Sequence, residues 1–172
     1  MFSAFANERG GWNGRFQPIA DDGAGWHPAP MTLQVRLASV ADVPAMHRIR
    51  LGVRENRLSD PRKITEASYH PYVQANSSWV AEIDGLIVGF ALMEGADRQI
   101  EALFVAPDAE GLGAGRALHA VMLNWAKAQG INELWLTTSS GTRAEHFYVK
   151  AGWEMVDALP GGEVRLHKTI PM

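Results

Sequence analysis

The stretch Val105-Ala106-Pro107-Asp108-Ala109-Glu110-Gly111-Leu112-Gly113-Ala114-Gly115-Arg116-Ala117-Leu118 decides how this chain folds. It joins an apolar segment, 100–105, to a longer segment whose apolar residues recur at helical spacing. Alternating glycines let the backbone turn sharply and approach a ligand closely, and the first N–H groups of a helix have no partner inside it. The stretch therefore predicts a strand-to-helix turn that binds an anion, with Arg116 as an additional cation.

The spacing of these glycines argues against two common classes of phosphate-containing ligand. It differs from the G-x-G-x-x-G of dinucleotide-binding folds, because position 116 is arginine, and no Gly-Lys-Ser/Thr follows as in a phosphate-binding loop of nucleotide triphosphatases. Nicotinamide and nucleotide triphosphate ligands are thereby disfavoured. Taken alone, the glycines could also serve only to turn the backbone.

Hydrophobic periodicity predicts the elements on either side of this turn. A tight hairpin is expected at Asp84-Gly85, and the helix that follows the glycines is expected to end at Gly130. The order is βααβββαβαββ, a mixed sheet with helices on its faces, which is an α/β (α+β) fold. We predict strands near 33–37, 79–83, 86–92, 100–105, 134–137, 153–156 and 164–170, and helices near 39–53, 65–74 (interrupted by His70-Pro71), 115–129 and 143–151.

Length and local composition predict one domain with an extension. The 172 residues suit a single domain, which we place over 33–172. In residues 1–32, glycine, proline and tryptophan are scattered without the period of a strand or a helix, so we expect a loosely ordered extension. The alternative is an arm that docks on the domain or on a partner, and a homodimer is one such arrangement.

The overall composition excludes several classes of protein. Hydrophobic residues make up 47% and charged residues 20%, which is typical of a globular domain rather than a collagenous or disordered chain. The formal net charge of -3 argues against nucleic acid as a partner. The chain has no cysteine, which fits a reducing compartment. Because no apolar run approaches about 18 residues, we expect no membrane partner and a cytoplasmic location.

Two segments together resemble a known family. The glycine stretch resembles the acyl-CoA signature of the GNAT superfamily of N-acetyltransferases, V-x-P-x-x-[Q/R]-G-x-G-x-[G/A]-x-x-L, and Ala144-Glu145-His146-Phe147-Tyr148-Val149-Lys150-Ala151-Gly152-Trp153 resembles its later motif, A-x-x-F-Y-x-K-x-G-[F/W]. The resemblance covers about residues 33–170. It implies an acetyltransferase domain that uses acetyl-CoA, with a sheet splayed between its fourth and fifth strands to admit the pantetheine arm.

The same resemblance implies which residues contact the cofactor. Backbone groups of Leu103, Phe104 and Val105 would pair with the pantetheine amides like an added strand. The pyrophosphate would lie on the glycine turn, which comprises Glu110, Gly111, Leu112, Gly113, Ala114, Gly115 and Arg116.

Two positions depart from the family pattern. Glu110 stands where the family usually carries Gln or Arg, and a carboxylate disfavours a pyrophosphate unless it points away or pairs with Arg116. Gly141 stands where many members have Asn, so one hydrogen bond to the cofactor is missing. A non-catalytic acyl-CoA-binding or sensing module is therefore the alternative to an enzyme.

The chemistry of acetyl transfer requires a base and an acid. An amine with a pKa near about 10.4 is charged at neutral pH, so a base must take its proton, and the departing thiolate must gain one. Glu101 is the candidate base, because it shares a strand face with Leu103 and Val105, where desolvation would raise its pKa. Tyr148 is the candidate acid. The alternative for Glu101 is a residue that only faces solvent, and the alternative for Tyr148 is a residue that only packs its helix against the sheet. Without a cysteine nucleophile, we expect direct attack in a ternary complex.

The acceptor site is expected in the first two helices and the loop between them. Arg50, Arg54 and Arg57 recur at i, i+4 and i+7, which predicts either a grip on an anionic group of the acceptor or a solvated charged face. We take Arg54 and Asn56 as candidate substrate-binding residues for a primary amine of a small molecule or a protein. The histidines lack metal-ligand spacing, so we expect no metal and place His119 and His146 on helix surfaces.

Overall fold

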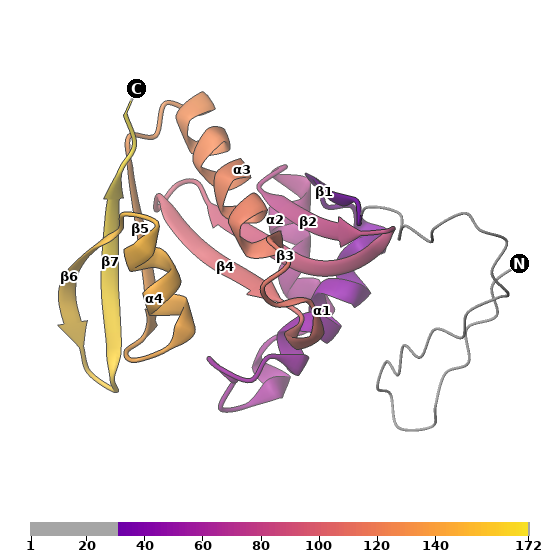
Figure 1. Ribbon diagram of the computed structural model, residues 1–172, viewed down its shortest axis with the longest axis horizontal. Coiled ribbons are helices and arrows are strands. Elements are labelled where there is room, and N and C mark those ends of the chain that lie inside the picture. Colours follow the sequence, from indigo (N-terminus) through magenta and orange to yellow (C-terminus); the bar gives the residue numbers. More distant parts are fainter. Residues whose placement is uncertain (1–30, 172) are drawn as a thin grey trace, which may run out of the picture. The chain divides into compact units, whose positions relative to one another are not determined.

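The computed structural model describes residues 31–171, which form a unit by themselves, so the predicted extension lies almost entirely outside the described residues. Strands and helices follow one another in the predicted order (Figure 1). The elements are β1 Leu33–Leu37, α1 Val43–Gly52, α2 His70–Gln74, β2 Ser78–Ile83, β3 Leu86–Glu94, β4 Gln99–Val105, α3 Ala114–Ala128, β5 Glu133–Ser139, α4 Arg143–Lys150, β6 Glu154–Leu159 and β7 Glu163–Thr169.

Local sequence signals explain most of the element ends. The Asp84-Gly85 turn between β2 and β3 has φ values of 50° and 82°, the left-handed backbone that such a hairpin requires. Before α1, the Ser39 N–H donates to the Asp42 carboxylate at 2.7 Å, a capping arrangement that satisfies a free donor. Gly130, at φ 71°, follows the end of α3 as predicted.

The predicted helix over 65–74 is divided in two. Residues Glu66–Tyr69 form a 3-10 turn, and α2 begins only at His70. Pro71 has no N–H to donate, so it cannot make the i→i−4 bond that a continuous α-helix needs here, and it stands instead in the first turn of α2, where that N–H is not required.

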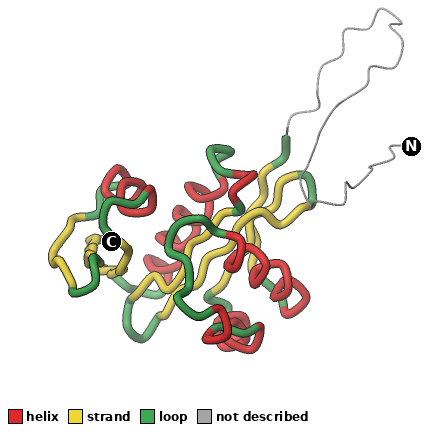
Figure 2. The backbone as a smooth tube through the Cα atoms, turned by 90° about the horizontal axis from the view of Figure 1, so that it is seen from below, coloured by secondary structure: helices red, strands yellow, loops and turns green. Residues whose placement is uncertain are grey.

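The sheet consists of two antiparallel groups that barely touch. Its strand order is β1-β2-β3-β4-β5-β7-β6, and the parallel pair β4 and β5 is in register only at Gln99 and Trp135. Figure 2 shows that β5, β7 and β6 run in a different direction from β1 to β4. The predicted splay between the fourth and fifth strands is therefore confirmed, and it leaves one edge of β4 without a strand partner.

A β-bulge interrupts β4 next to the splay. Leu92 pairs with Ala102 and Met93 pairs with Ile100, so Glu101 is the extra residue. The bulge changes the face to which side chains point, because Ile100 packs in the core beneath α3 whereas Ala102 packs in the core beneath α1. The simple alternation assumed from the sequence therefore fails at Glu101.

The helices cover both faces of the sheet and define two cores. Residues of α3 and α4 share one core, which includes Leu118, Met122 and Tyr148. Residues of α1 share the other with β2 and β3, and Met46, Val80 and Phe90 are each completely buried there. Figure 1 shows α3 and α4 on the near side of the strands and α1 and α2 behind them. Between residues 31 and 171, no helix has the length and apolar character needed to cross a bilayer.

Candidate functional site

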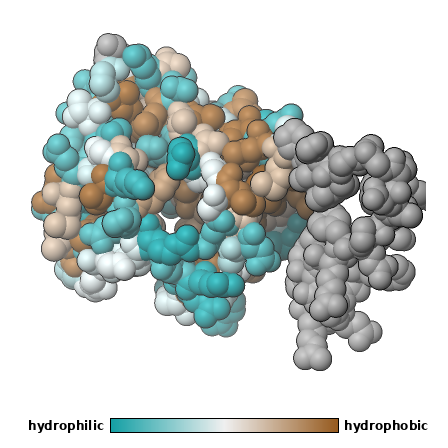
Figure 3. Space-filling view, in the orientation of Figure 1, coloured by the Kyte–Doolittle hydropathy of each residue, from teal (hydrophilic) through white to brown (hydrophobic). Residues whose placement is uncertain are grey.

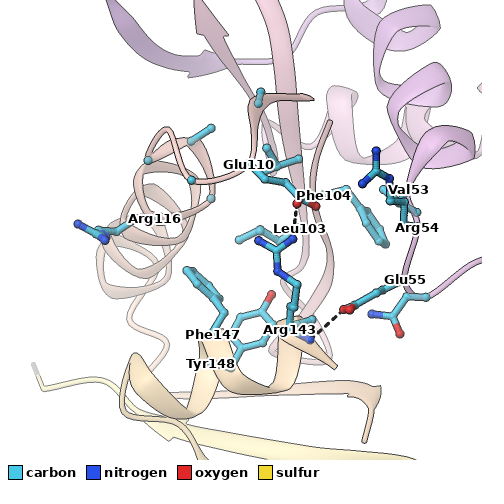
Figure 4. A pocket seen from close by; sticks show the side chains of 18 residues that line it. Val53, Arg54, Glu55, Leu103, Phe104, Glu110, Arg116, Arg143, Phe147 and Tyr148 are labelled. Carbon is cyan, nitrogen blue, oxygen red and sulfur yellow. Dashed lines mark hydrogen bonds and ion pairs between the residues drawn. The ribbon is translucent and has the colours of Figure 1, made fainter. Parts of the chain in front are cut away.

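The splay leads into a cavity of about 430 Å³. Its walls come from the loop after α1, the second half of β4, the turn that begins α3, and α4 (Figure 4). Figure 3 shows the same face of the molecule, which is hollowed between α4 and the β4–α3 turn, with hydrophilic residues along one rim. The residues that line the cavity are Val53, Arg54, Glu55, Asn56, Leu103, Phe104, Val105, Ala109, Glu110, Gly111, Gly113, Ala114, Gly115, Arg116, Arg143, Ala144, Phe147 and Tyr148.

The glycine turn presents the N-terminus of α3 to this cavity. Gly111 and Gly113 have φ values of 79° and 93°, a conformation that residues with a Cβ rarely adopt. No side chain caps α3, and its first turn contains no acidic residue. Its first N–H groups are therefore available to an anion in the cavity. The Leu112 side chain is 42% exposed and is not part of the cavity wall.

Glu110 pairs with Arg143, not with Arg116. The carboxylate of Glu110 and the guanidinium of Arg143 form an ion pair that joins the glycine turn to α4 (Figure 4). Glu110 raises the pKa of Arg143 and thus stabilises its charged form. In Figure 4 the Arg116 side chain points away from the other labelled residues. Of the two arrangements considered from the sequence, the pair with Arg116 does not form, and the cation beside Glu110 comes from α4 instead.

The second half of β4 forms the floor of the cavity. Leu103, Phe104 and Val105 all line it, as the resemblance implied for the cofactor-binding strand. Beyond Gln99, the edge of β4 that faces β5 has no paired strand, so its backbone groups are free for a ligand.

Tyr148 reaches the cavity from α4. The residue is only 6% exposed and packs against the rings of Phe147, Trp153 and His119. Burial raises its pKa above the usual range of a phenol, which keeps the hydroxyl protonated. Within residues 31–171 no hydrogen bond engages this hydroxyl, so its proton is available to a ligand.

His119 is a core residue rather than a surface residue. It is 6% exposed, and the indole N–H of Trp153 donates to its Nε2 at 2.9 Å. Burial lowers the pKa of His119 to about 4, so the imidazole is neutral at physiological pH. The expected surface position is therefore wrong for His119, because α3 turns this side chain toward α4. His146 is exposed as expected.

Glu101 lies outside the cavity wall. The β-bulge leaves it exposed, so the expected desolvation of its carboxylate is wrong. Burial raises the pKa of Tyr72 in α2, and the negative charges of Glu101 and Glu94 raise it further, which places both carboxylates near the α2 side of the sheet. A role for Glu101 as the base stays a prediction.

The loop after α1 crosses the open side of the splay. Arg54 is exposed and lines the cavity, whereas Asn56, with a φ of 53°, donates from its Nδ2 to the Thr138 hydroxyl at 3.3 Å. Glu55 accepts the backbone N–H of Arg143 at 2.8 Å. Asn56 and Glu55 thus tie this loop to β5 and α4.

Sequence reasoning missed Glu55 and Arg143. They lie 88 residues apart and belong to no motif, so nothing local in the sequence pairs them with each other or with Glu110. Phe147 and Ala144 also line the cavity, and the later motif that contains them was the available signal.

Comparison with known proteins agrees with this geometry. The model of the acetyltransferase (GNAT) family matches residues 44–153. The chain belongs to this family. Uncharacterized N-acetyltransferases of Mycobacterium bovis and Mycobacterium tuberculosis are 33% identical to this GNAT chain over 102 residues, and the match spans 57% of either protein. This chain thus matches little more than half the length of these curated relatives.

Solved GNAT structures share the fold at low sequence identity. Ard1 from Thermoplasma volcanium superposes with a TM-score of 0.72 at 20% identity, covering 81% of this chain and 99% of that one. The PaiA N-acetyltransferase from Thermoplasma acidophilum, solved in complex with coenzyme A, gives a TM-score of 0.70 at 18% identity, with coverages of 81% and 99%. These likenesses establish the arrangement of strands and helices.

Proposed function

We propose that this protein is an acetyl-CoA-dependent N-acetyltransferase. The single observation that carries the proposal is the uncapped N-terminus of α3, opened by left-handed Gly111 and Gly113 into a cavity that continues along the unpaired edge of β4. The N-terminus of α3 suits the anionic part of a ligand, and the unpaired edge of β4 suits an arm that contains amide groups. Membership of the GNAT family supports the same ligand.

The residues present fit the two parts of coenzyme A. The N–H groups of Gly113, Ala114 and Gly115 would hold the pyrophosphate, aided by the positive end of the α3 dipole. The free edge of β4 at Leu103 to Val105 would pair with the pantetheine amides. Glu110 does not oppose this binding, because Arg143 already neutralises its charge.

Tyr148 would serve as the general acid. Acetyl-CoA supplies an activated acetyl group whose departing sulfur must gain a proton. The Tyr148 hydroxyl lines the cavity, stays protonated because of its burial, and has no competing hydrogen bond among the described residues. It can donate to the sulfur and be restored from solvent.

The acceptor would be a primary amine that reaches the cavity from the α1 and α2 side. Arg54 lines that side, and Glu101 lies on it as the candidate base, acting through a water. The N–C bond forms as the C–S bond breaks, without a covalent acetyl-enzyme. Direct attack is favoured because the chain has no cysteine.

An acetyl-transfer assay tests this function. The purified protein is incubated with acetyl-CoA and a panel of polyamines, aminoglycosides, amino acids and peptide N-termini, and released thiol is measured. Turnover with at least one amine supports the proposal. Binding of acetyl-CoA without turnover on any of these amines would favour the non-catalytic binding or sensing module.

A further inference from the structure

Arg50 is a partly buried cation that has no counter-charge among residues 31–171. Its Nη1 atom is shielded from solvent and has no hydrogen-bond partner, and no ion pair within residues 31–171 includes it. Paired arginines such as Arg36 and Arg143 are more open to water, with side chains 43% and 68% exposed. Arg50 is therefore less exposed to water than these paired arginines, yet it has no anionic partner among the described residues.

Such an arrangement is costly unless a ligand completes it. Almost all buried polar groups in proteins are hydrogen-bonded. Burying a group without a hydrogen-bond partner costs free energy, and the cost is larger for a charged group than for a neutral one. Burial lowers the pKa of Arg50, and the opposing influence comes from the Tyr69 phenol rather than from a carboxylate. No carboxylate among residues 31–171 therefore compensates this guanidinium.

Arg50 lies against the wall of the cavity. Its guanidinium carbon is 4.4 Å from the centre of the Phe104 ring, and Phe104 lines the cavity. Arg54, in the loop that follows α1, lines it as well. Phe104 packs in the core beneath α1, whereas Leu103 packs beneath α3, so Arg50 lies on the face opposite the glycine turn. This is the side left for an acceptor when acetyl-CoA occupies the other.

The contact with Phe104 also holds the guanidinium in place, at a cation–π distance. Nη1 is shielded, so the remaining N–H groups of Arg50 are the ones that can donate charge-assisted hydrogen bonds to a carboxylate. A carboxylate matches the single positive charge. A phosphate monoester would add a second negative charge on a face where Glu94 and Glu101 already act on Tyr72.

We propose that the acceptor amine carries a carboxylate and that Arg50 binds it. The proposed acceptors are amino acids or peptides with an accessible carboxylate, and this assignment rests on the acetyl transfer proposed above. Arg50 selects the acceptor and takes no part in the chemical step.

The test compares matched acceptors. Amino acids, ω-amino acids and dipeptides are assayed beside the same compounds with the carboxylate converted to an amide, and aminoalkyl phosphates are assayed beside the corresponding amino alcohols. We expect kcat/KM to be about ten- to a hundredfold higher for the carboxylates than for their amides. Equal values for acids and amides, or a preference for the phosphates, would overturn the proposal.

Variants assign the effect to Arg50. Arg50→Gln should remove the preference for acids, mostly through KM, while leaving the amides unchanged, and Arg50→Lys should restore part of it. Arg48→Gln, an exposed arginine on the same helix, is the control for loss of charge. A loss of rate that is equal for acids and amides in Arg50→Gln would mean a structural role and would contradict the proposal.

A binding comparison separates this proposal from the proposed function. Saturation-transfer NMR measures binding of N-acetylated amino acids and of their amides to the wild-type protein, without acetyl-CoA. Preferential binding of the acids supports the carboxylate site even if no transfer occurs, whereas equal binding overturns it. Failure to bind acetyl-CoA, by contrast, would count against the proposed function alone.

Discussion

Tyr148 is the residue on which the proposed chemistry depends most. Tyr148→Phe keeps the ring that packs against Trp153 and Phe147 but removes the proton donor. Because a positioned general acid contributes about 10²- to 10⁴-fold, we predict that kcat falls by at least about a hundredfold. The acetyl-CoA dissociation constant should change little. Steady-state kinetics with isothermal titration checks both, and an unchanged kcat would remove Tyr148 from the mechanism.

Glu110 is one of the two residues at which this chain departs from the GNAT pattern. Its ion pair with Arg143 is solvent-accessible, so we expect the pair to add little to stability. Glu110→Gln removes a negative charge beside the phosphate-binding turn and frees Arg143, and should bind acetyl-CoA equally or a few-fold more tightly.

The matched variant for Glu110 is Arg143→Gln. It leaves the Glu110 carboxylate without its cation, so we expect weaker binding of acetyl-CoA, with the difference shrinking at high salt. Titration calorimetry at low and high ionic strength measures both variants. Weaker binding by Glu110→Gln would show that this carboxylate contacts the cofactor favourably.

At the scale of elements, the two ends of α3 allow a controlled comparison. Gly113 begins the helix at φ 93° and Gly130 follows it at φ 71°, and neither has a close neighbour where a Cβ would lie. Alanine at either position should cost about 1–2 kcal/mol of unfolding free energy. Only Gly113→Ala should also weaken acetyl-CoA binding, by about tenfold or more, because its backbone meets the phosphates. Equal affinities in the two variants would contradict the assigned phosphate site.

The packing of α3 against α4 predicts a pH dependence of stability. His119 has a pKa of about 4 in the folded protein against 6.5 in the unfolded chain, so the unfolded chain binds more protons between these values. Stability should therefore fall as the pH drops through this range, by about 2 kcal/mol between about pH 7.5 and pH 5. Denaturant unfolding measures the loss. His119→Gln keeps an acceptor for the Trp153 N–H, and its free energy of unfolding should fall much less over the same pH range. An equal fall in the variant would show that other groups cause the pH dependence.

The elements also show what sequence reasoning can reach. Alternation and turn residues located β2 and β3, because these signals act between neighbours in the chain. The Asp84-Gly85 turn sets the pairing only as far as Glu82 and Ile87, beyond which a shift of one residue changes the register. The bulge at Glu101 was missed, since it depends on how β4 meets β3 and on the splay. The burial of His119 was missed for the same reason, because α4 must first be placed against α3.

The same distinction between local and long-range signals applies to the site. The glycine turn and Tyr148 belong to local motifs, so they could be predicted from the sequence. The Glu110–Arg143 ion pair and the contact from Glu55 to Arg143 join segments that only the complete fold brings together. The predicted helical stripe of Arg50, Arg54 and Arg57 is wrong, because α1 ends at Gly52 and leaves the other two exposed in the loop after it. The packing of Arg50 against Phe104 depends on how α1 meets β4, which no local pattern shows.

At the scale of residues 31–171, the two halves of the sheet meet at one pair, Gln99 and Trp135. A ligand in the splay would contact β4 and the glycine turn on one side and α4 on the other. Cofactor binding should therefore stabilise both halves together, by mass action on the folded state.

Thermal unfolding with saturating acetyl-CoA, and with NAD as a control, tests the central claim most directly. Ligand at 100 times its dissociation constant adds about 2.7 kcal/mol, which for a chain of this size raises Tm by about 5–10 °C. We predict this rise with acetyl-CoA and no rise with NAD. No rise with acetyl-CoA at any soluble concentration, or an equal rise with NAD, would contradict an acetyl-CoA site at the α3 turn.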